Sequence, residues 1–536
     1  MRRFSIDLLR APSDAKDDRL KTMDRSQTSD LRVDRQSSLL ALGFGLAAFC
    51  LHALFAARYD IFRDELYFIV CGRHPDLGYA DQPPLVPLLA AGFYSLGHSL
   101  WCLRLPSTLA AAALAWLSVK FVFLLKGDRT AAVLAGLAVT IAPMLMGISA
   151  TLNTTSFDPL AWTLIAFFLV RALKAEDHKD LLFAGLVAGL DLEIKYALVF
   201  WGISLFLGLL LTRERRLLTH RGLWFGLALA GGLALPSFIW QAFHSFPFLE
   251  LAHAARAKNS DTPPLDFLLN QVLVMSPLLA PLWICGVLAP FWLKPLKGVQ
   301  FLSIAFISCF LLTLLVHGKD YYIAATYPVM FITGAVAATE ILQGATGRLV
   351  LTFWTLMASA FSVWIAPLAL PVLPVKDLKA FILKFPLRPQ AQEKSFKGTL
   401  LPQVFADQLG WHDYVNQVGT AWLALPKAER AKTAIKVDNY GEAAALDVYG
   451  KPFGLPPALS GHNQYFLWGL RGQNPENLLV VQNNPERLSP YCKTSKVIST
   501  TYSPDAMAYE NGKAIAYCQG LKIDLKAYWP QIKDYN

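Results

Sequence analysis

The sequence predicts a mostly α-helical protein that crosses a membrane many times and carries a C-terminal α/β domain outside the cytoplasm. Of its 536 residues, 54% are hydrophobic and 16% are charged, whereas soluble domains carry about 25% charged residues. Apolar segments of spanning length follow one another from residue 38 to about residue 370. From residue 373 onward the apolar segments give way to short alternating elements. These observations indicate a polytopic membrane domain followed by a small folded domain.

Residues 1–37 are polar and mixed in charge, so we expect a cytoplasmic tail. They contain no short apolar core with a small-residue cleavage site, and we therefore expect no cleaved signal peptide. The spacing of apolar runs predicts about eleven spans, with an upper limit of about thirteen. We expect the spans at 38–57, 102–125, 130–150, 159–173, 180–194, 197–212, 222–243, 270–293, 299–316, 322–342 and 349–370.

The distribution of basic residues predicts the orientation, because cytoplasmic turns are enriched in Lys and Arg. With a cytoplasmic N-terminus, every even-numbered gap between spans also faces the cytoplasm, and every one of these gaps is basic. The formal net charge of +10 is explained by these turns and does not indicate nucleic-acid binding. With an odd number of spans, residues 373–536 then lie outside the cytoplasm. The basic turn residues are Lys126, Arg129, Arg171, Lys174, Lys179, Arg213, Arg215, Arg216, Arg221, Lys294, Lys297 and Arg348.

The opposite face gathers charged and phenolic residues close to the ends of spans. The stretch "RDELYFIVCGRHPDLGYADQPPL" lies in the first external loop (58–101) and holds several carboxylates. Charges brought together at one membrane boundary suggest a functional site. The candidates on this face are Asp64, Glu65, Asp81, Asp158, Lys195, Arg256, Lys258, Lys319, Tyr321 and Tyr322.

The acidic candidates also have structural interpretations. Asp64 and Glu65 suit the first turn of an interfacial helix, where carboxylates favour the helix dipole. Adjacent residues on a helix point about 100° apart, so one carboxylate can face a reactant while the other braces the backbone or a cation such as Arg63. Asp81 before Pro83 and Pro84 has the form of a helix start, as does "FDP" around Asp158.

The basic candidates are open to two interpretations as well. Lys195 lies between two short apolar spans, where it can snorkel to headgroups or bind a phosphate. Arg256 and Lys258 are consistent with solvated loop charges. Lys319 with Tyr321 and Tyr322 suits either an aromatic belt or a phosphate site.

Other kinds of site find little support. No GxxxxGK[ST] or GxSxG motif is present, and the histidines show no metal-ligand spacing. We expect no resident cofactor, although a divalent metal stays open because His253 lies near Glu250 in the chain. Cys492 and Cys518 are the two cysteines of the last third, and either a disulfide or two buried thiols is consistent with the sequence.

Residues 373–536 read as a small α/β domain. "KAERAKTAIKVDNYGEAAALDVYG" predicts helix, strand and helix, and "NLLVVQNN", "KVISTTYS" and "GKAIAYCQG" predict strands between turns.

Several separated pieces resemble glycosyltransferase family 39, the protein O-mannosyltransferases and the aminoarabinose transferase of lipid A. The pieces are "FRDELYFIVCGRH…GYADQPPLVPLLA", "FDP", "IKYAL", "FPFLELAHAARAKN" and "GKDYYIAATYPV", in the family's order and on one membrane side. The likeness covers most of 38–345. "GEAAALDVYG" and "SGHNQYFLWG" are similar to the C-terminal parts of bacterial members.

The resemblance implies a type-C glycosyltransferase fold in a bacterial inner membrane, with the active site and C-terminal domain in the periplasm. It implies a polyprenyl-phosphate sugar donor, expected to be of undecaprenyl type, and inversion at the anomeric carbon. Asp64 matches the catalytic base and Glu65 its partner. Asp81 and Asp158 match residues that orient the acceptor or the sugar. Asp81 departs from the aminoarabinose transferase, where Glu followed by Lys stands in place of Asp81 and Gln82.

The same resemblance assigns the lipid phosphate to Lys195, Arg256, Lys319, Tyr321 and Tyr322, and we expect the neighbouring Lys258 to contribute to the same site. The acceptor stays open among a lipid, a polysaccharide and a secreted protein. Two competing interpretations remain: a transporter or flippase for an anionic lipid or solute, and a ligand sensor. Transporters keep charges at the midplane between repeats, and no internal repeat is present here. A sensor leaves the Asp64–Glu65 pair unexplained.

Overall fold

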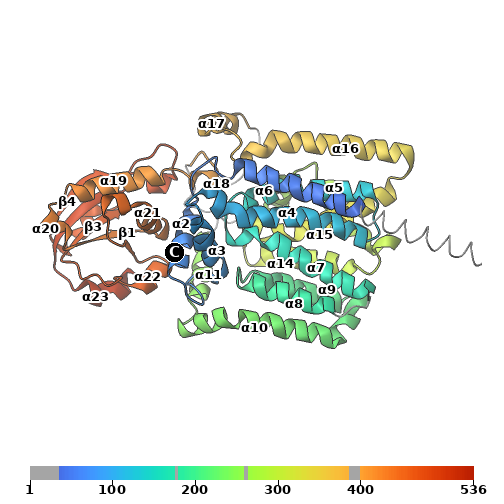
Figure 1. Ribbon diagram of the computed structural model, residues 1–536, viewed down its shortest axis with the longest axis horizontal. Coiled ribbons are helices and arrows are strands. Elements are labelled where there is room, and N and C mark those ends of the chain that lie inside the picture. Colours follow the sequence, from blue (N-terminus) through green and yellow to red (C-terminus); the bar gives the residue numbers. More distant parts are fainter. Residues whose placement is uncertain (1–35, 176–178, 259–262, 386–398, 536) are drawn as a thin grey trace, which may run out of the picture.

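The computed structural model describes residues 36–175, 179–258, 263–385 and 399–535 (Figure 1). Most of the predicted cytoplasmic tail therefore lies outside the described residues. Figure 1 shows a bundle whose helices run along the long axis of the molecule, with a smaller α/β domain packed at one end. The chain end at residue 36 leaves the bundle at the end opposite this domain. This arrangement agrees with the predicted order of a membrane domain followed by a folded domain.

The bundle contains six apolar helices long enough to cross a membrane among the described residues. The most buried is α15 (Tyr327–Ile341), which continues from the 3₁₀ helix η5 (Asp320–Thr326). α10 and α16 lie at the outside of the bundle, where their apolar side chains would face lipid (Figure 1). The other long helices are Gln36–Phe55, α4 (Leu100–Leu124) and α7 (Asp158–Ala175), with α10 spanning Arg221–Phe243 and α16 spanning Gly344–Ile365.

A seventh span is formed if α5 (Arg129–Ile141) and α6 (Pro143–Ser149) are counted together, although they meet at a 56° bend. Pro143 explains the bend, because proline lacks an N–H and forces the preceding residue, Ala142, into an extended conformation. Shorter helices fill the bundle: α8 (Lys179–Leu192), α9 (Leu198–Leu210), α12 (Pro264–Val274), α13 (Ala280–Leu288) and α14 (Gln300–Leu315).

Each predicted apolar segment coincides with helix, which confirms the predicted fold class. The segment 270–293 is divided between α12 and α13, with a break at Met275–Leu279. Because several helices are shorter than a full span, the count of about eleven spans stays a prediction. Two helices outside the predicted spans, α11 (Pro247–Lys258) and α17 (Val375–Lys384), were not predicted.

The C-terminal domain is built on a five-stranded sheet of order β2-β1-β3-β5-β4. β1 (Thr433–Val437) pairs in parallel with β2 (Leu459–Ser460) and β3 (Asn477–Gln482), whereas β5 (Ala514–Leu521) is antiparallel to β3 and to β4 (Cys492–Thr500). The predicted succession of helix, strand and helix corresponds to α20 (Lys427–Arg430), β1 and α21 (Tyr440–Tyr449). The other three predicted strands are β3, β4 and β5.

Cys492 and Cys518 form a disulfide between β4 and β5, with their Cα atoms 5.4 Å apart. Of the two possibilities that the sequence left open, the structure selects the bridge. Disulfides persist in oxidising compartments, so this bond fits a domain that lies outside the cytoplasm.

The first external loop and the C-terminal domain share one hydrophobic core. The loop folds into two helices, α2 (Arg63–Arg73) and α3 (Leu85–Ser95). Buried side chains of α2 and α3 belong to the same cluster as those of α19 (Trp411–Leu423), α21, β1 and β3. The sequence placed the loop and the domain on the same membrane face but did not show that they pack together, since apolar periodicity shows that a helix has a buried face but not what covers it.

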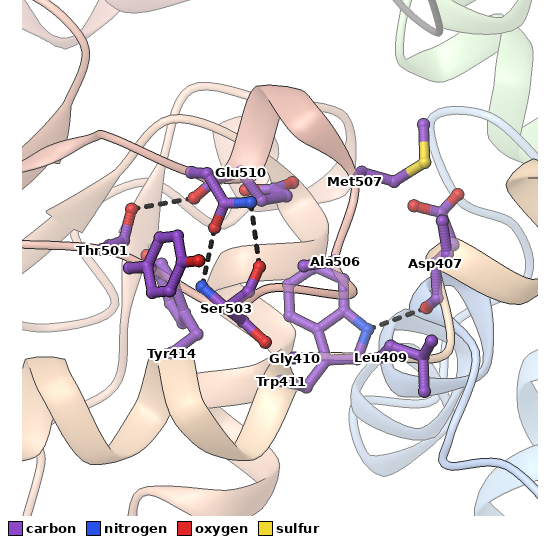
Figure 2. Close-up of a pocket in the computed structure, with 13 residues that line it drawn as sticks. Asp407, Leu409, Gly410, Trp411, Tyr414, Thr501, Ser503, Ala506, Met507 and Glu510 are labelled. Atoms are coloured by element: carbon purple, nitrogen blue, oxygen red, sulfur yellow. Dashed lines mark hydrogen bonds between the residues drawn. The ribbon is translucent and has the colours of Figure 1, made fainter. Parts of the chain in front are cut away.

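A small pocket lies beside this junction, between the start of α19 and the segment 501–511 (Figure 2). Trp411 lines it and donates from Nε1 to the backbone oxygen of Asp407 at 2.8 Å. Thr501 closes another side, with its hydroxyl bonded to the backbone oxygen of Glu510 at 2.8 Å. None of the site residues predicted from the sequence lines this pocket.

Candidate active site

Asp64 lies in the first turn of α2, as the sequence predicted for a helix start. Its side chain is 32% exposed, and its Oδ1 accepts a hydrogen bond of 2.7 Å from the Tyr440 hydroxyl of α21. The Nε of Arg63 lies 3.6 Å from the same oxygen. Burial raises the pKa of Tyr440 well above its ordinary value, so the phenol stays protonated and remains a donor. Asp64 is therefore oriented on one side and open on the other.

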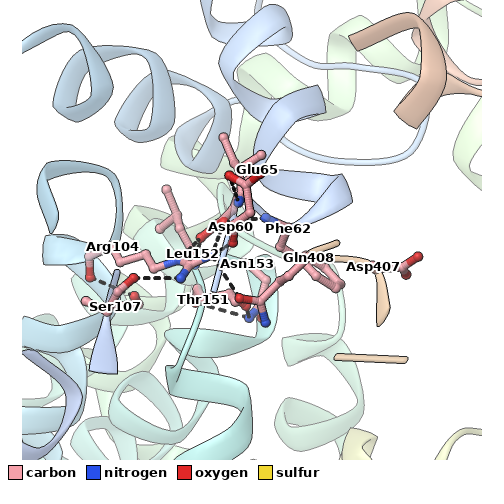
Figure 3. A network of polar contacts seen from close by, with 12 residues as sticks. Asp60, Phe62, Glu65, Arg104, Ser107, Thr151, Leu152, Asn153, Asp407 and Gln408 are labelled. Carbon is pink, nitrogen blue, oxygen red and sulfur yellow. Dashed lines mark hydrogen bonds and ion pairs between the residues drawn. The ribbon is translucent and has the colours of Figure 1, made fainter. Parts of the chain in front are cut away.

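Glu65 points the other way, into a buried polar network (Figure 3). Its two carboxylate oxygens each receive a 2.8 Å hydrogen bond from the Arg104 guanidinium. They also accept the backbone N–H groups of Phe62 and Leu152, both at 2.8 Å. Arg104 donates further to the backbone oxygens of Ala56 and Asp60. Glu65 thus ties the start of α2 to α4 and to the turn before α7.

This geometry gives the two neighbouring carboxylates different surroundings, as the 100° offset required. The cation that faces Glu65 is Arg104, whereas the sequence argument named Arg63. Arg63 instead lies 3.6 Å from the carboxylate of Asp407 and donates to the Tyr509 hydroxyl. The signal for Arg104 was present, because an arginine inside an otherwise apolar span is expensive and needs a partner.

Asp81 does not start a helix, which corrects the helix-start interpretation. α3 begins at Leu85, and its N-cap residue Pro84 offers no side-chain cap. The Asp81 carboxylate instead accepts a 2.8 Å hydrogen bond from Tyr67 and a 3.0 Å hydrogen bond from the Asn463 amide. Burial raises the pKa of Asp81 to about 6, and these two hydrogen bonds act in the opposite direction.

Tyr440 and Asn463 belong to the C-terminal domain, and the sequence argument did not include them among the site residues. The Tyr440 ring packs on the Tyr67 ring with centroids 4.7 Å apart, and the His462 ring lies 5.0 Å from Tyr440. Asp64, Tyr440, Tyr67 and Asp81 therefore form a continuous row. Asn463 lies in "SGHNQYFLWG", which the resemblance had singled out, whereas Tyr440 directly precedes "GEAAALDVYG" and lay outside the pieces that carried the resemblance.

A second group, called here the basic–aromatic cluster, consists of Asp158, Lys195, Lys319, Tyr321 and Tyr322. The Lys195 ammonium lies 3.4 Å from the Asp158 carboxylate and donates to the Thr155 hydroxyl at 2.7 Å. It also lies 5.8 Å and 5.4 Å from the ring centroids of Tyr321 and Tyr322. Lys319 lies 6.0 Å from the Tyr321 ring. The structure thus brings together five of the predicted residues from three separate segments.

Asp158 begins α7, in agreement with its predicted place in the chain. Its side chain is buried, and its Oδ1 has no hydrogen-bond partner. Arg256 and Lys258 lie in the last turn of α11, but their side chains lie outside the described residues. Their predicted phosphate contacts therefore stay predictions.

The basic–aromatic cluster is connected to the first external loop through the backbone. Glu65 binds the N–H of Leu152, shortly before Thr155, and the N–H of Leu85 donates to the oxygen of Glu193 at 3.0 Å. Within the described ranges, no three His, Cys, Asp or Glu side chains come together as a metal site. The arrangement offers one open carboxylate and one fixed cation on the same side of the bundle.

Gly441 lets α21 approach α2 closely. A Cβ at this position would lie 2.4 Å from the Arg63 Cγ, which is closer than real contacts allow. Gly441→Ala should therefore displace Arg63 and Tyr440 and destabilise the junction by about 1–3 kcal/mol. The thermal unfolding temperature should fall. Gly92→Ala is the matched control, because Gly92 lies on an exposed helix face with open space around it; a similar loss in both variants would contradict the close-approach argument.

Comparisons with known proteins agree with this architecture. Residues 81–240 match the family described as dolichyl-phosphate-mannose-protein mannosyltransferase. The crystal structure of ArnT from Cupriavidus metallidurans bound to undecaprenyl phosphate aligns with a TM-score of 0.56 and 13% identity, covering 89% of this chain and 97% of that chain. The same protein in the apo state gives the same values. No curated protein sequence matches the chain. The matches confirm the resemblance that the motifs indicated and show that the chain has the ArnT fold.

Proposed function

We propose that this chain, with its ArnT fold and its mannosyltransferase-family segment, is an inverting glycosyltransferase. It would move a sugar from a polyprenyl-phosphate donor to an acceptor hydroxyl or phosphate at the outer face of the membrane. One observation carries the proposal: the half-exposed carboxylate of Asp64, oriented by Tyr440, lies on the same side of the bundle as the fixed ammonium of Lys195. The ArnT structure with undecaprenyl phosphate supports this class of donor.

Asp64 acts as the general base in this proposal. The free carboxylate oxygen of Asp64 accepts the proton of the acceptor hydroxyl. At the same time the oxygen of this hydroxyl attacks the anomeric carbon. The bond from the anomeric carbon to the phosphate oxygen breaks, and its electron pair leaves with the polyprenyl phosphate. One displacement at one carbon inverts its configuration, as in single-displacement glycosidases. A positioned base contributes about 10²–10⁴-fold to such a rate.

The leaving phosphate gains negative charge as the bond breaks, and fixed positive groups stabilise it. Lys195 is the best placed of the basic candidates, because Thr155, Asp158 and two tyrosine rings hold its ammonium. Lys319 and the Tyr321 and Tyr322 phenols would complete the phosphate contacts. Asp158 would orient the substrate through its unpartnered Oδ1.

Glu65 serves the site indirectly. With both oxygens bound by Arg104 and two backbone N–H groups, it fixes the first turn of α2 and hence the direction of Asp64. We assign Glu65 as a positioning residue. Asp81 would orient the acceptor or the sugar beside Asp64.

The polytopic bundle and the disulfide support a place in a bacterial inner membrane, with the C-terminal domain in the periplasm and the N-terminus in the cytoplasm. The prenyl chain of the donor can stay in lipid while its phosphate reaches the basic–aromatic cluster at the bundle end. The acceptor would be a glycolipid, a polysaccharide or a secreted protein.

The proposal is tested with the purified full-length protein in lipid nanodiscs. Synthetic undecaprenyl-phosphate sugars serve as donors, a crude envelope extract serves as acceptor, and transfer or sugar release is followed. Turnover with inversion supports the proposal. Absence of turnover with every sugar, together with flux of such a lipid across proteoliposome membranes, would favour the transporter and overturn it.

Binding of the lipid phosphate tests Lys195 separately. Lys195→Met/Asp158→Asn removes the cation together with the charge of its ion-pair partner, and Asp158→Asn alone, measured beside it, separates the contribution of Lys195. Loss of one charge-assisted contact is worth about 1.5–3 kcal/mol, so we expect the Kd for undecaprenyl phosphate to rise about tenfold or more. Calorimetry in nanodiscs measures it. Lys432→Met is the control, because Lys432 is exposed on the C-terminal domain; equal affinity of both variants would remove Lys195 from the phosphate site.

A further inference from the structure

Asn463 has an unusual backbone conformation in the loop between β2 and α22 (Gln464–Trp468). Its φ is 48° and its ψ is −131°, a region that non-glycine residues rarely adopt. Such residues are energetically costly and cluster at functional sites. Neighbouring contacts hold the loop in place: Gln464 accepts the N–H of Ala80 at 2.9 Å and donates its own N–H to the Tyr67 hydroxyl at 3.2 Å.

The Asn463 side chain is buried and only half satisfied. Asn463 is 5% exposed, and its Nδ2 donates a hydrogen bond to the Asp81 Oδ2 at 3.0 Å. A carboxylate oxygen accepts from the amide nitrogen, so this contact fixes which end of the amide faces Asp81. The other end, Oδ1, has no hydrogen-bond partner. A buried carbonyl without a donor destabilises the folded protein, and a ligand donor that binds it removes this cost.

The surroundings of Asn463 Oδ1 define what would satisfy it. Asp81 supplies carboxylate oxygens next to it, and Tyr67 already donates to that carboxylate. The Asp81–Tyr67–Tyr440–Asp64 row connects the position directly to the proposed base. The polar atoms around Asn463 Oδ1 are therefore mainly hydrogen-bond acceptors. They favour a ligand group that carries N–H or O–H donors and disfavour an anionic group.

We propose that Asn463 and Asp81 form a subsite that binds a hydrogen-bond-donating group, a hydroxyl or an ammonium, of one of the two substrates. The inference rests on the proposed function. The group belongs either to the transferred sugar or to the acceptor, since both carry such donors. Through Asn463, the C-terminal domain would take part in substrate selection.

The subsite predicts discrimination against substrates that lack the donor group. A buried acceptor left without its donor costs about 1–3 kcal/mol, which corresponds to about 5–150-fold in kcat/KM. Anionic substituents at the same position should be rejected at least as strongly, because the Asp81 carboxylate is ionised near neutral pH.

The test compares wild type with Asn463→Gly and Asn463→Ala. Glycine removes the amide and also relieves the backbone conformation, so its thermal unfolding midpoint should equal or exceed that of wild type. Alanine removes the amide but keeps the strained backbone. Each variant is assayed in nanodiscs with the undecaprenyl-phosphate sugar that wild type uses, and with derivatives in which each hydroxyl or amine is replaced by hydrogen. A parallel series varies the acceptor in the same way.

In wild type, one derivative should be about tenfold or more poorer than its parent. In both variants this preference should collapse to near unity. Collapse in the sugar series assigns the subsite to the donor, and collapse in the acceptor series assigns it to the acceptor. A purely structural Asn463 would instead give a lower unfolding midpoint in Asn463→Gly and equal losses for all substrates, which overturns the inference. The proposed function fails differently, with no turnover by wild type.

The pH dependence gives an independent readout. Ionised Asp81 accepts from the ligand more strongly than the neutral acid does, so kcat/KM for the parent substrate and its preference over the derivative should both fall as the pH falls through about 6 in wild type. Loss of the Asn463 hydrogen bond removes a contact that lowers the Asp81 pKa, so the acidic limb of kcat/KM for the parent substrate should move to higher pH in Asn463→Gly. An unmoved limb counts against the subsite. The groups that face Asp81 are Tyr67, Cys71 and Asp64 of α2, Asn463, and Tyr535 near the C-terminus.

Discussion

Asp64→Asn should reduce sugar transfer by about 10²–10⁴-fold, because the amide cannot accept the acceptor's proton. Folding should be preserved. Asparagine has the shape of aspartate and keeps a side-chain oxygen for the hydroxyl of Tyr440, so the contact between α2 and α21 survives. Arg63, which lies 3.6 Å from Asp64, keeps its second ion pair with Asp407, so the lost charge of Asp64 does not leave this cation without a partner.

Asp76→Asn is the matched control for this experiment. Asp76 lies in the same first external loop, is exposed, and bonds only locally, to the N–H of Leu77. Initial rates in nanodiscs, together with binding of undecaprenyl phosphate, separate chemistry from binding. We expect loss of transfer with unchanged lipid binding in Asp64→Asn and full activity in Asp76→Asn. Full activity in Asp64→Asn would show that another group is the base.

Glu65→Gln should be the most destabilising single change in the site. Glu65 and Arg104 are 0% and 1% exposed, and their ion pair is bidentate. Removing one charge of a buried pair leaves the other uncompensated and costs about 3–5 kcal/mol. Arg104→Met should be comparably damaging, because Arg104 also satisfies the backbone oxygens of Ala56 and Asp60.

The unfolding midpoint in nanodiscs, followed by tryptophan fluorescence, measures this effect. The double variant Glu65→Met/Arg104→Met should recover part of the lost stability, since no unpaired charge remains. Glu476→Gln is the control, because the Lys432–Glu476 pair has a 3.0 Å contact but is exposed and should contribute little. If Glu65→Gln unfolds at the wild-type temperature, the Glu65–Arg104 network does not hold α2 in place.

The features that the sequence predicted well are those with a local signal. Apolar runs located the helices of the bundle, and short segments of strand-forming residues between turns located β1, β3, β4 and β5. The acidic first turn correctly placed the start of α2 next to Asp64. Each of these depends on a few neighbouring residues, whose periodicity is readable without a structure.

The contacts that organise the candidate site have no such signal. Tyr440 and Asp64 are 376 residues apart in the chain, and Asn463 and Asp81 are 382 apart. Even the Glu65–Arg104 pair spans 39 residues and two elements. Asp81 shows the converse failure. Its local pattern is typical of a helix start, but its carboxylate accepts hydrogen bonds from Tyr67 and Asn463 and does not cap α3.

The core shared by α2, α3 and the C-terminal domain has a consequence for biosynthesis. The first external loop emerges from the ribosome early, but the elements that cover its buried face, α19, α21, β1 and β3, are made last. Until these segments are made and pack, the loop exposes the apolar side chains of its buried face. The first external loop should therefore mature only after translation ends. A chain truncated before α19 should be inactive and prone to proteolysis in that loop, although every membrane span is present.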